Sequence, residues 1–68
     1  MKLTLNGQEE ECEGAHTLAD LLRRMEIDPQ GPGIAVAWNG RVIPRSDLES
    51  TRLSEGDRIE IVRAVQGG

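Results

Sequence analysis

The stretch Thr17–Met25, TLADLLRRM, predicts an amphipathic helix. Its apolar residues recur at the i, i+3, i+4, i+7 spacing of one helix face: Leu18, Leu21, Leu22 and Met25. A lone helix with one apolar stripe must bury that stripe against another layer. The rest of the chain therefore has to supply a sheet.

Polar residues mark both ends of the predicted helix. The Thr17 hydroxyl can cap the first turn, where the helix dipole also favours the Asp20 carboxylate. Asp28-Pro29 is predicted to stop the helix, because a residue before proline avoids the α region.

Alternating segments on both sides of the helix predict two hairpins, residues 1–5 with 8–13 and residues 34–38 with 41–43. Each hairpin turns at an Asn-Gly pair, which suits the positive φ values of a tight turn. Residues 46–55 are an irregular connection pinned by Leu48 and Leu53. A last strand then runs to Val65, with Ile59 and Ile61 pointing inward.

The resulting order is β-β-α-β-β-β, which predicts an α+β fold with one helix across a mixed sheet. A first hairpin, a crossing helix and a final strand beside the first strand are typical of the ubiquitin-like β-grasp fold. We expect a domain over residues 1–65 and a flexible Gly-Gly tail over residues 66–68.

Length and composition restrict the function. A chain of 68 residues makes one small domain with little room for an enclosed active site. The net charge of −4 argues against a nucleic-acid partner and favours docking on basic patches of other proteins. No apolar run suggests a membrane span or a signal peptide. Because Cys12 is the single cysteine, we expect a protein of the reducing cytoplasm, and we expect it to be monomeric when free.

Several polar residues have a structural interpretation that we prefer to a catalytic one. Glu9, Glu10 and Glu11 alternate between the two faces of a strand and indicate a solvated edge. Cys12 is the single cysteine, so no internal disulfide is possible, and a partly buried small residue is favoured over a nucleophile paired with His16. One cysteine and one histidine predict no metal site.

The C-terminus carries the strongest functional signal. A strand that ends in Gly67-Gly68 is a poor way to stabilise a fold and a good way to present a carboxyl group. Fully extended, the segment Val65, Gln66, Gly67 and Gly68 reaches roughly 13 Å at about 3.3 Å per residue. We therefore expect the Gly68 carboxylate to be the working group.

The sheet face away from the helix is the predicted partner surface. Ala37 and Val62 should point outward there, close to the start of the tail. We expect four arginines to border this patch: Arg41, Arg45, Arg58 and Arg63. Trp38 either anchors a partner or, as we prefer, packs at the edge of the core.

A series of short motifs resembles the ThiS family of thiamine-pathway sulfur carriers. The motifs are Asn6-Gly7, TLADLL at 17–22, AVAWNG at 35–40, VIPR at 42–45, GDRIEIV at 56–62 and the terminal Gly67-Gly68. Together they extend over nearly the whole chain. Trp38 departs from the smaller aliphatic residue that is common at this position in the family.

The resemblance implies a carrier that other enzymes act on, not an enzyme. A ThiF-type E1-like enzyme would use ATP to adenylate Gly68, and sulfur relayed as a persulfide from a cysteine desulfurase route would displace AMP. The resulting thiocarboxylate would supply sulfur to a ThiG-type thiazole synthase. Related carriers for molybdopterin, tRNA thiolation or cysteine synthesis remain alternatives, as does a ubiquitin-like interaction module.

The sequence also indicates that other enzymes must activate the C-terminal carboxylate. An α-carboxyl group, with an ordinary pKa of about 3.5, is ionised at neutral pH and is a poor electrophile until it is activated. Gly31-Pro32-Gly33 is the one glycine-rich loop, and no Lys-Ser/Thr follows it to bind a nucleotide. We therefore expect no bound cofactor, with ATP and persulfide used only through partners.

Overall fold

Both hairpins form around their Asn-Gly turns in the computed structural model, which describes residues 1–64. β1 (Lys2–Leu5) pairs with β2 (Gln8–Glu11), and β3 (Ile34–Trp38) pairs with β4 (Arg41–Ile43), both antiparallel. The turn residues Asn6 and Asn39 take φ values of 48° and 50°. These are the values that favour asparagine and glycine in a tight hairpin turn.

The second strand is shorter than the sequence predicted. β2 ends at Glu11 and not at residue 13. Cys12 is buried in the core, which turns the chain away from the sheet edge. Every residue of β2 is exposed, so the solvated acidic edge is confirmed.

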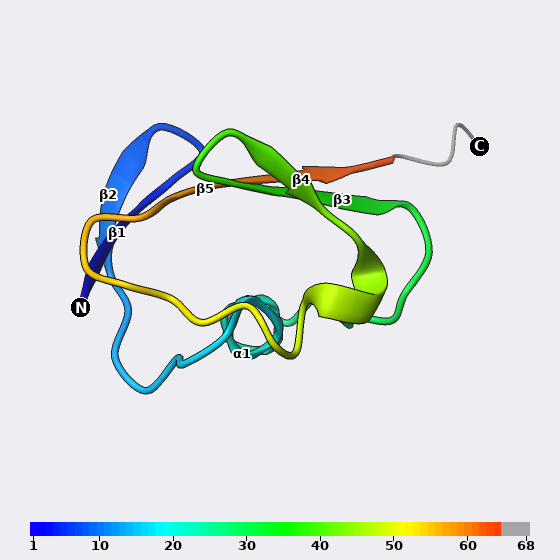
Figure 1. Cartoon of the computed structure of the whole chain (residues 1–68), viewed down its shortest axis with the longest axis horizontal. Helices are drawn as coiled ribbons and strands as arrows, with labels where there is room; N and C mark the ends of the chain where they lie inside the picture. The colour runs from blue at the N-terminus through cyan, green and yellow to red at the C-terminus, as the bar shows by residue number, and fades with distance from the viewer. Residues whose placement is uncertain (65–68) are drawn as a thin grey trace.

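The last strand, β5 (Arg58–Arg63), lies in the middle of the sheet. The strand order is β2-β1-β5-β3-β4, with β5 parallel to β1 and antiparallel to β3. In Figure 1, β5 crosses the length of the molecule and ends at the side opposite the N-terminus. The mixed sheet and single covering helix confirm the predicted α+β, β-grasp arrangement.

The helix α1 (Leu18–Arg24) begins as the sequence predicted. The Asp20 amide donates to the Thr17 hydroxyl at 3.1 Å, and the Thr17 amide donates to the Asp20 carboxylate at 3.1 Å. These two bonds form a capping box, which satisfies amides that a helix N-terminus otherwise leaves free.

The prediction that Asp28-Pro29 ends the helix is wrong. The helix ends at Arg24, and Glu26 then takes a positive φ of 62°. The Glu26 amide donates to the Arg23 carbonyl at 2.9 Å, and the Ile27 amide donates to the Leu22 carbonyl at 2.8 Å. This pair of bonds is a Schellman motif, which ends the helix several residues before Pro29.

The early end of the helix also changes its apolar face. Met25, predicted to lie in the buried stripe, is the C-cap and is 37% exposed. Ile27 is buried in its place, because the reversal of the chain after Glu26 brings it back toward the core.

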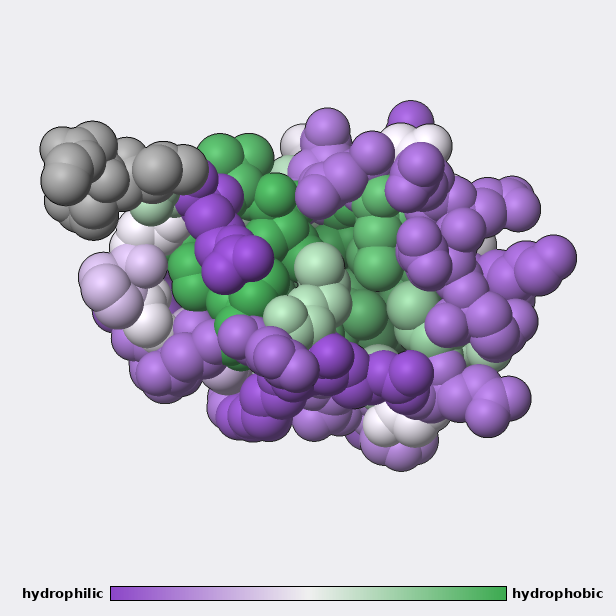
Figure 2. Space-filling view, turned by 180° about the vertical axis from the view of Figure 1, so that it is seen from behind, coloured by the Kyte–Doolittle hydropathy of each residue, from purple (hydrophilic) through white to green (hydrophobic). Residues whose placement is uncertain are grey.

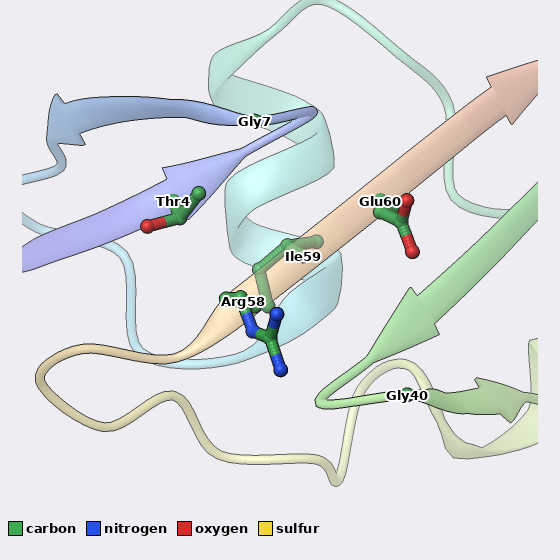
Figure 3. A pocket seen from close by; sticks show the side chains of 6 residues that line it. All are labelled: Thr4, Gly7, Gly40, Arg58, Ile59 and Glu60. Atoms are coloured by element: carbon green, nitrogen blue, oxygen red, sulfur yellow. The ribbon is translucent and has the colours of Figure 1, made fainter.

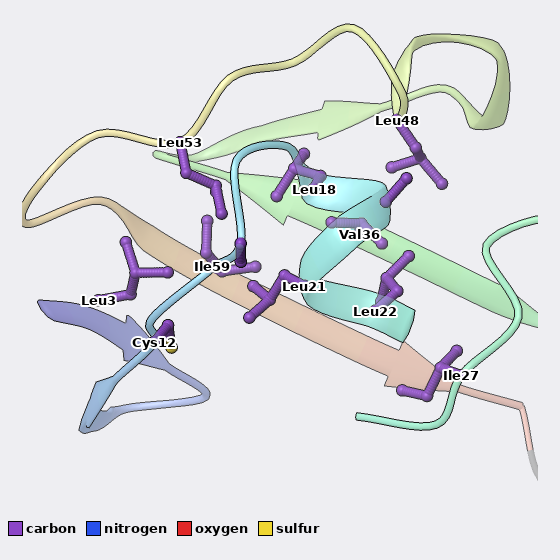
Figure 4. Close-up of a cluster of buried hydrophobic side chains, with 12 residues drawn as sticks. Leu3, Cys12, Leu18, Leu21, Leu22, Ile27, Val36, Leu48, Leu53 and Ile59 are labelled. Atoms are coloured by element: carbon purple, nitrogen blue, oxygen red, sulfur yellow. The ribbon is translucent and has the colours of Figure 1, made fainter. Parts of the chain in front are cut away.

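The core lies between α1 and the sheet (Figure 4). Its buried members are Leu3, Cys12, Ala15, Leu18, Ala19, Leu21, Leu22, Ile27, Val36, Leu48, Leu53 and Ile59. Partly buried hydrophobic residues surround them: Leu5, Ile34, Trp38, Ile43 and Ile61. Figure 2 shows hydrophobic side chains reaching the surface within hydrophilic borders on one side of the molecule.

The connection before β5 closes the remaining side of the helix. It includes a 3-10 turn (Arg45–Asp47), and both predicted anchors, Leu48 and Leu53, are buried. Carbonyls of this segment accept the amides of Leu18 and Ala19, each at 3.0 Å. Helix amides without an intrahelical partner are thus satisfied by a segment some thirty residues away in the sequence.

Candidate functional site

Hydrogen bonds from both Asn-Gly turns hold the beginning of β5. The Asn6 amide donates to the Ile59 carbonyl at 2.9 Å, and the Asn6 side-chain oxygen accepts the Ile61 amide at 2.8 Å. On the other side, the Asn39 amide donates to the Arg58 carbonyl and the Asn39 side chain accepts the Arg58 amide. The strand that leads to the C-terminus is therefore fixed from both flanks.

The end of β5 is held by β3 and by the loop before it. Ile34 pairs with Arg63, and the Ala64 amide donates to the Gly33 carbonyl at 2.7 Å. Gly33 has a φ of +72°, and a Cβ there would lie 3.3 Å from the Ala64 Cβ. Glycine is therefore the residue that allows this close approach at the last described position.

The predicted acceptor and tail residues lie beyond this point. Gly68, Gly67, Gln66 and Val65 fall outside the described residues. Within residues 1–64, the candidate site consists of β5, which leads to the tail, and the sheet face beside it.

A buried carboxylate ties β5 to the second hairpin. Asp57 is 8% exposed and accepts three hydrogen bonds: from the Trp38 indole at 2.9 Å, from the Asn39 side-chain amide at 3.0 Å and from the Ser54 backbone amide at 2.8 Å. Burial alone raises the pKa of this carboxyl, but the three hydrogen bonds outweigh burial and hold the pKa below its ordinary value. Asp57 therefore stays ionised at neutral pH.

This arrangement accounts for Trp38. Its side chain packs against the core, as preferred, and its indole nitrogen has a buried partner. The sequence analysis missed Asp57 and the two asparagine side chains. The Asn-Gly pairs signalled the turns, but no local pattern signals a bond across 55 residues, such as that between Asn6 and Ile61.

The sheet face away from the helix, here called the outer face, carries a shallow apolar cleft of about 200 Å³. Its lining comes from β3, β4 and β5: Ala35, Val36, Ala37, Val42, Glu60 and Val62. The predicted pair Ala37 and Val62 lies here together, and Val62 is 63% exposed. Val42, 76% exposed and opposite Ala37, is a member that the sequence analysis missed, although the register of a hairpin that turns at Asn39-Gly40 could have revealed it.

The predicted border of four arginines is largely wrong. Arg63 lies opposite Ile34 and Arg41 lies opposite Trp38, so strand alternation places both on the side of the helix. Arg45 lies in the 3-10 turn and donates to the Gly31 carbonyl at 3.1 Å. Of the four, Arg58 alone projects from the outer face.

Cys12 has the structural role that the sequence favoured. It is buried, and burial raises the pKa of its thiol, which disfavours the nucleophilic thiolate. His16 is exposed beside the helix cap, where its backbone amide donates to Asp20.

Within residues 1–64, no cluster of His, Cys, Asp and Glu side chains is suited to a metal ion. No helix in this part of the chain is long and apolar enough to cross a membrane.

Comparison with known proteins identifies the family. The sequence profile of the ThiS family matches residues 3–68. The chain belongs to the ThiS family. The match extends beyond the described structure to Gly68.

Individual ThiS-family proteins support this assignment. The crystal structure of the thiamine biosynthesis protein ThiS from Geobacter metallireducens matches with a TM-score of 0.80 and 30% identity, over all of both chains. The sulfur carrier protein ThiS of Escherichia coli is 28% identical over the full length of both sequences.

A second kind of relative is a larger protein. The thiazole synthase of Paramagnetospirillum magneticum is 32% identical over all 68 residues, and this chain spans 20% of its length. Another thiazole synthase, from Magnetococcus marinus, is 35% identical with the same coverage. In these proteins a ThiS-like segment and a thiazole synthase are parts of one polypeptide.

Proposed function

We propose that this ThiS-family protein carries sulfur on its C-terminal carboxylate, Gly68. A partner enzyme of the ThiF type adenylates the carboxylate with ATP and releases pyrophosphate, and the outer sulfur of a persulfide then attacks the acyl-adenylate and displaces AMP. A thiol cleaves the S–S bond of the resulting acyl disulfide, which leaves the thiocarboxylate on Gly68 and releases a disulfide. A ThiG-type thiazole synthase then takes this sulfur for the thiazole ring. The chain binds no cofactor of its own, and works as a monomer in the cytoplasm, where Cys12 stays reduced.

The observation that carries this proposal is the support of β5 up to Ala64. Hydrogen bonds with Asn6, Asn39 and Gly33 hold β5 and Ala64 on the body, and the four residues after Ala64 end in two glycines. An extended Gly-Gly segment has no Cβ to obstruct a narrow channel of an adenylating enzyme. The body thus serves as a handle from which the carboxylate is presented.

The outer face supports the second half of the proposal. Ala37, Val42 and Val62 form an apolar surface next to the point where the tail leaves the body. Such a surface can dock a partner while the tail enters its active site. We propose that the thiazole synthase docks here. The synthases that contain a ThiS-like segment in the same polypeptide favour this partner over those of the molybdopterin, tRNA and cysteine pathways.

The test is transfer of sulfur to the purified chain. After incubation with ATP, the adenylating enzyme of the same organism, a persulfide source and a thiol reductant, intact mass spectrometry should show sulfur in place of one oxygen at Gly68. Deletion of Gly68 should abolish this mass change and leave the circular dichroism spectrum unchanged. A Gly67→Ala variant is the matched control, because it keeps the length of the tail and should be modified more slowly. Equal sulfur acceptance by the truncated chain would contradict the proposal.

A further inference from the structure

The outer face of β5 carries a charge pattern that the carrier function does not explain. Strand alternation places Arg58, Glu60 and Val62 on this face in that order toward the tail, about 7 Å apart. Figure 3 shows the Arg58 and Glu60 side chains projecting on the side away from the helix, whereas Ile59 points back toward it. A cation, an anion and an apolar side chain thus form a row that ends where the tail begins.

Both charged side chains are exposed and lack an ion-pair partner within residues 1–64. The three ion pairs of this part of the chain involve Glu11, Asp20, Arg23 and Glu49 and the N-terminal amine, but neither Arg58 nor Glu60. The side chains make no hydrogen bond to other described residues that would fix them to the fold. Within this part of the chain, neither charge is held in place by an ion pair or a side-chain hydrogen bond.

Glu60 stands between two clefts on the outer face. On one side is the apolar cleft with Ala37, Val42 and Val62. On the other is a cleft of about 210 Å³ between the two Asn-Gly turns, lined by Thr4, Gly7, Gly40, Arg58, Ile59 and Glu60 (Figure 3). A surface that covers the first cleft must also cover Glu60, and burial of this carboxylate without a cation would be costly.

We propose that Arg58 and Glu60 determine which thiazole synthase surface binds this carrier and in which orientation. The complementary surface presents an apolar side chain to Val62, a lysine or arginine to Glu60 and an aspartate or glutamate to Arg58. A surface with the two charges in the opposite order would place like charges against each other, which disfavours binding. This inference rests on the proposed function, because it assigns the specificity of the docking surface used there.

The test uses a variant that exchanges the two charges, Arg58→Glu with Glu60→Arg. It keeps the composition and the net charge of −4, so long-range attraction to a basic partner is unchanged. The neutral variants Arg58→Gln and Glu60→Gln are the matched controls. Thermal unfolding followed by circular dichroism verifies that each variant is folded.

Binding to the thiazole synthase of the same organism is measured by isothermal titration calorimetry. We expect each neutral variant to bind about 3-fold more weakly and the exchanged variant at least about 10-fold more weakly. The inference would be overturned if the exchanged variant bound with an affinity within about 2-fold of the wild type, which is roughly the range expected for any surface substitution. It would also be overturned if the exchanged variant bound no more weakly than the neutral variants. Sulfur acceptance at Gly68 is followed separately by mass spectrometry. Failure of the wild-type chain to accept sulfur counts against the proposed function, whereas a folded exchanged variant with normal affinity counts against the charge row alone.

Discussion

At the scale of single residues, the end of the helix places Glu26 in a strained backbone conformation. It occupies the position after the C-cap with a φ of 62°, a conformation that glycine adopts without strain and that other residues disfavour. Its backbone nevertheless completes the Schellman motif with Arg23, which lets Ile27 reach the core. The bonds of the motif and the burial of Ile27 thus offset the strain at Glu26.

This strain predicts that Glu26→Gly stabilises the protein. Removing the Cβ relieves the strain, and part of the gain is offset by the greater freedom of glycine in the unfolded chain. We expect a net increase of about 0.5–1 kcal/mol in the free energy of unfolding. Urea titration monitored by the fluorescence of Trp38, the single tryptophan, measures it.

The matched control is Glu26→Ala, which removes the same charge and keeps the Cβ. It should leave the stability within about 0.5 kcal/mol of the wild type. If alanine stabilises as much as glycine, the charge and not the backbone conformation is the cause.

At the scale of elements, β5 depends on side chains from turns as much as on strand pairing. β1 pairs with β5 only at Thr4–Arg58 and Leu5–Ile59, and beyond this point the Asn6 side chain accepts the Ile61 amide. Asn6 therefore extends the parallel edge by one hydrogen bond after β1 has turned away. This bond supports the segment from which the tail leaves.

We predict that Asn6→Gly loosens β5 specifically on this edge. Glycine keeps the freedom that the turn requires and removes the acceptor, so the free energy of unfolding should fall by about 1–2 kcal/mol. Amide hydrogen exchange measured by NMR should accelerate at Ile61. The amides of Glu60 and Val62, in register with Ala37 and Ala35 of β3, should change much less.

The Asn6→Asp variant retains a side-chain oxygen at the same place. It should keep most of the protection at Ile61. Equal acceleration in the two variants would mean that the turn conformation, and not the side-chain bond, protects this amide.

At the scale of the whole molecule, carboxylates with low pKa values set the dependence of stability on pH. A hydrogen bond from the N-terminal amine lowers the pKa of Glu11, and backbone hydrogen bonds from His16 and Thr17 lower the pKa of Asp20. Asp57 is the buried case, and its hydrogen bonds join the turn before β5 to the end of β3. Each group contributes stability above its unfolded-state pKa, about 4, and this contribution is lost as the pH falls through the lower folded value.

The free energy of unfolding should therefore decrease in acid, below about pH 4.5, and Asp57→Asn should remove part of this decrease. At pH 7 the asparagine places an N–H group against donors, so we expect a loss of about 1–3 kcal/mol. The difference from the wild type should shrink as the pH falls below about 4, because the Asp57 carboxyl of the unfolded chain then binds a proton and the contribution of the ionised carboxylate is progressively lost. Urea titrations at a series of pH values, followed by circular dichroism, measure both effects.

Asp47→Asn provides the control, since Asp47 is exposed and its carboxylate accepts no hydrogen bond from residues 1–64. It should leave the pH profile unchanged. A difference for Asp57→Asn that stays constant from pH 7 to pH 3 would show that ionisation of Asp57 does not matter for stability.

Local patterns in the sequence were enough to predict the order of the helix and strands and to indicate the family. Helical spacing in residues 17–22, alternation in the strands and the two Asn-Gly pairs are local signals, because each reflects how neighbouring side chains share a face or how a turn restricts φ. Strand alternation from Ile59 also placed Val62 correctly on the outer face. The same alternation puts Arg63 on the helix side, so its placement at the border of the outer face was an error of interpretation and not a limit of the sequence.

Tertiary structure decided the features that depend on distant partners. The helix ends at Arg24 because Ile27 gains burial in a core built from the whole chain, and local propensity favours an end at proline. Asp57 is stable as a buried charge only because Trp38, Asn39 and Ser54 converge on it. Such bonds become favourable once packing has brought the segments together, and for this reason no local pattern in the sequence predicts them.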